Sequence, residues 1–158
     1  MAAGGLIYTA SFSNVSVTNA AQNFWEFIGA STASVLIHSI RLTFTPTITS
    51  GVAQDVRALI NMGTMTGTGT GGSATTPTPT NKRNTVAAVT TINRLVTTPG
   101  ATPTIMSSDN VSIIVPYERI FTPDQRIPIP AGLKWYIGIS AGLGSAYNAS
   151  SEIFFEEI

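Results

Sequence analysis

Apolar and polar residues alternate with a period of two along most of the chain. The alternation is clearest over residues 34–45, and residues 54–62 repeat it. Since successive side chains of a β-strand point to opposite faces of its sheet, both stretches are predicted to be half-buried strands. We expect them to pair with each other through a turn at residues 47–51. The predicted buried face of the first stretch carries Leu36, His38, Ile40, Leu42 and Phe44.

The same pattern predicts further strands at residues 6–17, 24–28, 86–96, 104–115, 133–141 and 151–158. Glycine, proline and asparagine separate the strands, and the prolines fall at strand ends. Helical periodicity is close to absent, and strands do not alternate with helices. The sequence therefore predicts one all-β domain over residues 1–158, an antiparallel β-sandwich or jelly roll of about eight strands.

Residues 63–84 break the alternation with a low-complexity run of glycine, threonine and proline. Loops of this length inside a domain are usually functional or disordered, and the prolines favour an extended conformation. Two interpretations stay open: an arm that lies across a neighbouring subunit, or a flexible loop without a partner. For the first, the predicted contact residues are Gly67, Thr68, Gly69, Thr70, Pro77 and Pro79.

Composition narrows the choice of partners. The chain has 158 residues, of which eight are basic and eight acidic, and it has no cysteine. Charged residues make up 10% of it, far below the roughly 25% of an average soluble domain, which suggests that assembly covers part of the surface. The zero net charge and the lack of a basic stripe argue against nucleic-acid binding. No apolar run approaches the roughly 18 residues of a membrane helix, so no membrane partner is expected.

Residues with catalytic or cofactor-binding chemistry form no recognisable site. Gly67, Gly69 and Gly72 match the dinucleotide-binding spacing, but threonine and proline follow where that motif needs a helix. The single histidine, His38, excludes multi-histidine metal sites. Its place on the predicted apolar face favours a buried neutral imidazole that is bonded to backbone or to a hydroxyl. We therefore expect no enzyme, no cofactor and no metal.

Two other functions remain as alternatives. Trp25 and Phe27 share one face of their predicted strand while Phe24 lies on the other, so at least one aromatic ring is expected outside the core or in an interface. An exposed ring near Trp25 or Trp135 would suit a receptor- or carbohydrate-binding domain, since aromatic rings stack on sugars. A hydrolase on a β-sandwich would instead bring carboxylates together near His38 in a cleft.

Five short motifs follow one another across nearly the full chain. They are F-W-E-F-I at residues 24–28, V-L-I-H-S-I-R-L at 35–42, a glycine-rich run into T-P-T-P at 67–79, P-Y-E-R at 116–119 and F-E-E-I at 155–158. In this order the chain resembles a family of phage virion proteins of the jelly-roll type. Within that family it resembles a capsid decoration, or cement, protein.

The resemblance implies a virion protein without catalytic residues, which binds the capsid surface after assembly in the host cytoplasm. The implied partners are the major capsid protein and further copies of the chain, as a trimer. The alternative is a receptor- or carbohydrate-binding domain of a phage tail or head fibre. A second contact segment is expected at residues 117–130, where prolines and charges suit a rigid loop. The candidate contact residues there are Tyr117, Arg119 and Arg126.

Overall fold

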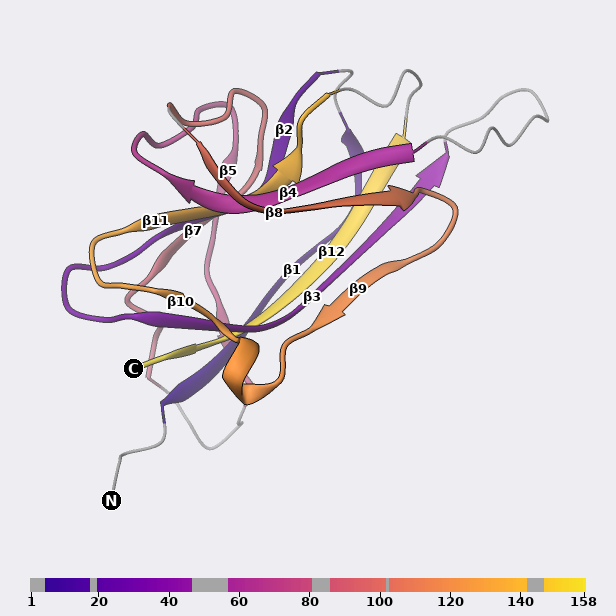
Figure 1. Cartoon of the computed structure of the whole chain (residues 1–158). Helices are drawn as coiled ribbons and strands as arrows, with labels where there is room; N and C mark the ends of the chain where they lie inside the picture. The colour runs from indigo at the N-terminus through magenta and orange to yellow at the C-terminus, as the bar shows by residue number, and fades with distance from the viewer. Residues whose placement is uncertain (1–4, 18–19, 47–56, 81–85, 102, 142–146) are drawn as a thin grey trace.

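Alternation gives most of the long strands one apolar face, and the chain buries these faces between two antiparallel sheets (Figure 1). The computed structural model describes residues 5–17, 20–46, 57–80, 86–101, 103–141 and 147–158. Within these residues the only helix is a single 3-10 turn, η1 (Pro123–Gln125). The prediction of an all-β sandwich is confirmed.

Each sheet is named here after a strand in its interior. The β12 sheet has the order β10–β3–β12–β1–β6, and β9 also pairs with β3. Its strands are β1 (Leu6–Val17), β3 (Val35–Pro46), β6 (Thr78–Pro79), β9 (Tyr117–Ile120), β10 (Ile127–Ile129) and β12 (Tyr147–Glu157). The β11 sheet has the order β5–β7–β2–β11–β4–β8. Its strands are β2 (Gln22–Ile28), β4 (Arg57–Met65), β5 (Ser73–Thr75), β7 (Thr91–Val96), β8 (Thr104–Ser112) and β11 (Lys134–Ile139).

Strands that follow each other in the sequence mostly lie in different sheets. β1 and β3 belong to the β12 sheet, whereas β2 and β4 belong to the β11 sheet. The expected pairing of residues 34–45 with residues 54–62 is therefore wrong, because β3 pairs with β12 and β4 pairs with β11 and β8. The expected turn at residues 47–51 lies outside the described residues. Alternation predicts that a strand exists, but it does not tell which sheet the strand joins.

Four short strands, β5, β6, β9 and β10, occur where the sequence predicts loops. Each has two to four residues, which is too few for alternation to be recognised. Two of them fall within residues 63–84: β5 pairs with β7, and β6 pairs with β1. Residues 63–80 therefore lie against both sheets of their own chain, and residues 81–84 are outside the described part.

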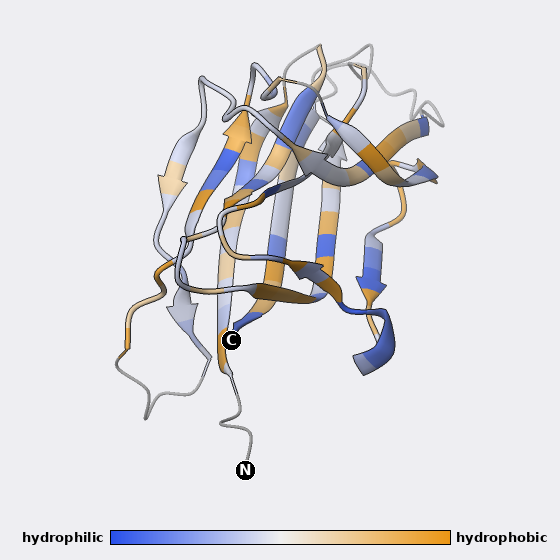
Figure 2. Cartoon of the chain, turned by 60° about the vertical axis from the view of Figure 1, so that its left-hand side comes forward, coloured by the Kyte–Doolittle hydropathy of each residue, from blue (hydrophilic) through white to orange (hydrophobic). Residues whose placement is uncertain are grey.

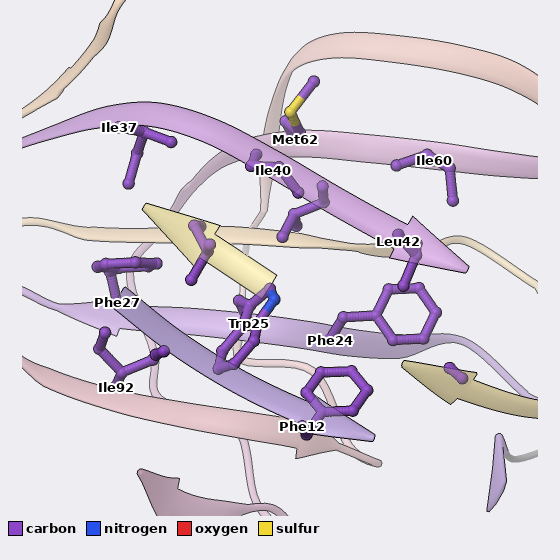
Figure 3. Packing of buried hydrophobic residues seen from close by; sticks show 14 of the residues in the cluster. Phe12, Phe24, Trp25, Phe27, Ile37, Ile40, Leu42, Ile60, Met62 and Ile92 are labelled. Atoms are coloured by element: carbon purple, nitrogen blue, oxygen red, sulfur yellow. The ribbon is translucent and has the colours of Figure 1, made fainter. Parts of the chain in front are cut away.

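A layer of aromatic side chains, packed among aliphatic ones, lies between the sheets, and Figure 3 shows part of it around Trp25 and Phe27. These two side chains come from β2, Trp135 comes from β11 and Phe155 from β12, and none is more than 1% exposed. Phe27 meets Trp135 and Phe155 edge to face, with ring centroids 5.9 and 5.2 Å apart. Such ring pairs contribute roughly 0.5–1.5 kcal/mol each beyond the burial of their area. The aromatic layer therefore joins the two sheets into one core.

A bulge in β3 changes which of its residues face the core. His38 is an extra residue without a partner on β12, since the register shifts between Phe154 and Phe155. Because of this shift, Ile37 and Ile40 both point into the core although they are three positions apart. The prediction that His38 shares the buried face with Ile40 is therefore wrong, and His38 lies on the outer face of the β12 sheet.

A second bulge, in β2, brings Phe24 into the core. The register between β2 and β11 shifts between Ile137 and Gly138, so Phe24 and Trp25 are both fully buried although they are adjacent. Phe24 meets the ring of Phe44 edge to face at 5.7 Å. The prediction that at least one aromatic ring of this strand lies outside the core is wrong, because a bulge breaks strict alternation.

Hydrogen bonds tie the indole of Trp25 to the opposite sheet. Its Nε1 donates to Ser151 Oγ at 2.8 Å, and that hydroxyl donates to the carbonyl oxygen of Arg41, also at 2.8 Å. Trp25 has no exposed surface, and Ser151 is 5% exposed. A polar side chain at this depth of the core is tolerated because it satisfies a buried donor.

Replacing Ser151 tests this bridge. We expect Ser151→Ala to lower the free energy of unfolding by about 1–3 kcal/mol, since the Trp25 N–H loses its acceptor while it stays buried. Urea unfolding followed by tryptophan fluorescence measures the change. Ser13→Ala, at an exposed position of β1, is the control and should unfold like the natural sequence. Equal unfolding midpoints for both variants would contradict the role given to Ser151.

Candidate interaction surface

Both sheets end on the same side of the molecule, at β8 and β9. β8 is the last strand of the β11 sheet, and within the described residues its outer edge makes no ladder with another strand. β9 lies at an edge of the β12 sheet, where it pairs with β3. Figure 1 shows the two strands joined by a turn along this border. An unpaired strand edge presents free backbone donors and acceptors to a partner.

A polar clasp made of Ser107, Asp109, Tyr117 and Arg119 joins β8 to β9. Asp109 Oδ2 accepts hydrogen bonds from the Tyr117 hydroxyl at 2.7 Å and from Arg119 Nη1 at 2.9 Å. Arg119 Nη1 also donates to Ser107 Oγ at 2.8 Å. The guanidinium of Arg119 lies over the ring of Phe121, 5.3 Å from its centroid. The clasp links the two sheets at this border and pairs its two charges with each other.

Next to the clasp, the two sheets part around an opening of about 340 Å³. Its apolar walls come from both sheets and include Met62, Met106, Ile120, Phe121, Ile127 and Trp135. Trp135 is 1% exposed, and its indole Nε1 has no hydrogen-bond partner. Leaving such a donor buried and unpaired costs roughly 1–3 kcal/mol. The opening is therefore bordered by a buried donor without an acceptor.

Four exposed apolar side chains follow the same side, and we call them the β8–β9 rim: Met106, Ile114, Val115 and Ile120. The exposed fraction of each lies between 59% and 71%. Met106 and Ile120 flank the opening, and the other two lie in the turn that joins the strands. Exposed apolar residues that gather along one edge indicate an interaction site, whereas scattered ones do not. The rim, the free β8 edge and the opening together form the candidate surface.

The predicted contact residues of the glycine-rich segment lie elsewhere. Gly67, Thr68, Gly69 and Thr70 form a loop over the outer face of the β11 sheet. The backbone of Thr70 exchanges two hydrogen bonds with that of Thr98, and Gly69 N donates to Glu26 Oε2 at 3.0 Å. Glu26 has no exposed surface, so this loop seals a buried carboxylate.

The prolines of the same segment contact the other sheet. Pro77 is buried, and Pro79 is half-buried where it pairs with Tyr8 of β1. Thr80 N donates to the carbonyl oxygen of Ile7 at 3.0 Å. The segment that the sequence predicts as an arm or loop is thus a strap that runs from one sheet to the other on its own chain.

The contact residues predicted at 117–130 separate into two places. Tyr117 and Arg119 belong to the clasp and are engaged within the chain. Arg126 lies on the outer face of the β12 sheet, where its Nη1 is 3.5 Å from Glu156 Oε2. His38 Nε2 lies 3.0 Å from the same oxygen. The expected hydrogen bond of His38 to backbone or to a hydroxyl is therefore wrong, because the bulge turns His38 outward toward this carboxylate.

This arrangement gives little support for the alternatives raised by the sequence. One described carboxylate, Glu156, contacts His38, where a hydrolase would need two that converge in a cleft. Trp25 and Trp135 are both buried, so neither offers the exposed ring expected of a carbohydrate platform. The described ranges contain no cluster of three histidine or acidic side chains that suits a metal ion. Nor do they contain a helix of the length and apolarity needed to cross a membrane.

Sequence reasoning did not find Asp109, Met106, Ile120 or the opening. The motif P-Y-E-R points to Tyr117 and Arg119, but their partner Asp109 lies in an ordinary-looking polar stretch of another strand. Met106 and Ile120 look like core residues, because exposure at a strand edge depends on the sheet order. The one signal in the sequence is the alternation within β9. It places Tyr117 and Arg119 on one face of the strand and Ile120 on the other.

Comparison of the chain with protein-family models, with curated proteins and with solved structures finds no match.

The clasp predicts a loss of stability at high pH. Burial, and then the hydrogen bond to Asp109, raise the pKa of the Tyr117 hydroxyl from its ordinary value of 10.0 to about 12. Between these two values the unfolded chain loses a proton that the folded chain keeps, so the free energy of unfolding should fall as the pH rises from 10 to 12. Tyr117→Phe lacks this contribution and should show a shallower fall.

Urea unfolding followed by circular dichroism at pH 8, 10 and about 11.5 measures both slopes. At pH 8 the tyrosine is protonated in both states, so the difference there gives the cost of the lost hydrogen bond alone. Parallel curves for the two proteins over the whole range would show that Tyr117 ionises alike in the folded and unfolded chain.

Proposed function

We propose that this chain is a structural virion protein without catalytic activity, a decoration or cement protein that binds an assembled phage head and stabilises it. The β8–β9 rim is the observation that carries the proposal. It places four apolar side chains, each at least 59% exposed, beside an unpaired strand edge and an opening into the core. Such a surface suits a permanent protein partner better than it suits water.

The strand order gives further support. Without the short strands of the strap and without β7, one sheet has the order β10–β3–β12–β1, with β9 also on β3, and the other has the order β2–β11–β4–β8. This order is compatible with a jelly roll, a fold that occurs in viral capsid proteins and also in lectins. The order agrees with the resemblance that the motifs suggest, but fold alone does not select a function.

The small number of charged residues lowers the desolvation cost of this mode of binding. Charged residues make up 10% of the chain, and Asp109 and Arg119, which lie beside the rim, pair with each other. A partner that covers this pair removes no unpaired ion from water, which is the main cost of burying charged surface. We infer that the partners are the major capsid protein and further copies of the chain, as a trimer on the capsid surface.

A binding experiment with matched variants tests the proposal. Purified protein is first weighed by light scattering and then sedimented with shells that lack it. We expect a trimer that pellets with the shells. Met106→Glu and Ile120→Glu should bind at least about tenfold more weakly, because each places a charge in the covered rim.

Leu133→Glu is the control, because Leu133 is an exposed apolar residue, 49% accessible, in the turn before β11. It should bind like the natural sequence. Equal binding by all three variants would remove the rim from the proposed interface. A monomer that ignores shells and binds cell-surface glycans would overturn the cement function in favour of a receptor-binding domain.

A further inference from the structure

A second hollow, separate from the opening at the rim, lies on the outer face of the β11 sheet. Its volume is about 220 Å³. Its apolar wall consists of Met65, Pro99, Pro103, Ile105 and Ile139. Among the described residues, no charged side chain lines it. A concave, mainly apolar hollow with a few polar groups is the usual form of a small-ligand site.

Four polar side chains line the hollow: Ser140 is exposed, whereas Asn23, Asn61 and Tyr136 are buried. Asn23 is 3% exposed, and Asn61 and Tyr136 are each 5% exposed. The side-chain amide of Asn23 donates to Glu26 Oε1 at 2.8 Å, and Asn61 Oδ1 accepts from the Ser108 hydroxyl at 2.6 Å. Both amides are therefore fixed before any ligand arrives, which lowers the entropic cost of binding.

Tyr136 differs from the two asparagines, because within the described residues its hydroxyl has no hydrogen-bond partner. Burial raises the pKa of this hydroxyl, so it stays a protonated donor at neutral pH. A buried donor that lines a cavity gains a hydrogen bond only when a ligand or water supplies an acceptor.

The walls of the hollow are also built rigidly. Thr66 N donates to the carbonyl oxygen of Ala101 at 3.2 Å, and the backbones of Thr70 and Thr98 bond in both directions at 2.9 and 3.1 Å. These bonds fasten the wall around Pro99 to the loop that Glu26 holds through Gly69 N.

The floor depends on a glycine at the β2–β11 bulge. A Cβ atom at Gly138 would lie 2.5 Å from Asn23 Oδ1 and 2.8 Å from Asn23 Cα, both closer than real atoms approach. Because Gly138 has no side chain, the amide of Asn23 can lie across β11 at the bottom of the hollow. The bulge that completes the core on one face of the sheet thus shapes a site on the other.

We propose that this hollow binds an uncharged, mainly apolar group of about the size of one amino-acid side chain, with an oxygen acceptor for the Tyr136 hydroxyl. A charged group would lose its hydration without a counter-ion in the wall. A sugar ring carries hydroxyl groups on all sides, and most of this wall offers them no partner. The volume is below the roughly 300–1,000 Å³ of sites for drug-sized ligands, so the occupant is a fragment or a single side chain.

Two probes with the same chemistry separate a peptide from a free small molecule. N-acetyl-L-prolinamide represents a residue of a protein segment, and N-acetylpyrrolidine represents the same ring and carbonyl without a peptide chain. Each probe is titrated into the protein, and the carbon-13 methyl resonances of Met65, Ile105 and Ile139 are followed. The resonances should shift saturably with a Kd of a few millimolar. A Kd of 1 mM corresponds to a binding free energy of about 4 kcal/mol. Binding of the prolinamide alone identifies a peptide ligand, and binding of both identifies the ring and carbonyl as sufficient.

Variants assign the shifts to the hollow. Tyr136→Phe should weaken binding about fivefold, the value of one lost hydrogen bond of about 1 kcal/mol. Ile105→Glu should abolish binding, because it places a charge in the wall. Ile114→Glu is the matched control: its side chain is 60% exposed against 55% for Ile105, but it does not line the hollow. If Tyr136→Phe does not fold, the Ile105 and Ile114 pair decides the result, since both positions are on the surface.

Several results would overturn the proposal. They are the absence of saturable shifts up to about 50 mM, equal loss of binding in Ile105→Glu and Ile114→Glu, full affinity in a folded Tyr136→Phe, and tighter binding of methyl glucoside than of either probe. None of these measurements uses shells, so the hollow can be accepted or rejected independently of the cement function.

Discussion

The two sheets depend on one aromatic layer, and their strands depart from regular pairing in order to supply it. A strictly alternating β2 would place Trp25 and Phe24 on opposite faces, but the bulge opposite Ile137 turns both inward. The bulge at His38 likewise lets the residues on both sides of it in β3, Ile37 and Ile40, point into the core. Each bulge costs a regular ladder position, and the burial of a large side chain, worth roughly 1.5–3 kcal/mol, offsets that cost.

The orientation of the β2 side chains also determines which residues lie on the outer face of the β11 sheet. Because the aromatic residues of β2 point inward, Glu26 points outward, where a carboxylate would ordinarily meet water. It is instead fully covered, since Asn23 and the backbone N–H of Gly69 donate to its two oxygens. A buried carboxylate requires such donors, so the glycine-rich loop must lie where it does. The loop in turn positions Pro99 and so forms one wall of the outer hollow.

Alternation was sufficient to locate the long strands, because eleven or twelve residues of β1, β3 and β12 repeat the pattern many times. It could not locate bulges, because one extra residue leaves the hydrophobic composition of a strand unchanged. Nor could it assign the strap at residues 63–80, whose short strands are held by backbone hydrogen bonds and carry no side-chain pattern. The sequence predicted only part of the clasp. Tyr117 and Arg119 belong to a motif that stands out in the sequence, but it is the sheet order that brings their acceptor Asp109 next to them.

Much of the chain's sparse charge has an internal partner. Glu26 and Glu157 accept backbone N–H groups, Asp109 pairs with Arg119, and Glu156 contacts both His38 and Arg126. Carboxylates that stabilise the fold in this way are poorly available for steering a charged partner. We therefore propose that recognition by this surface rests on shape, on apolar side chains and on the edge of β8 that is unpaired within the described residues. These are short-range interactions, which favour a permanent neighbour over a passing one, and the rim lies beside an opening into the core.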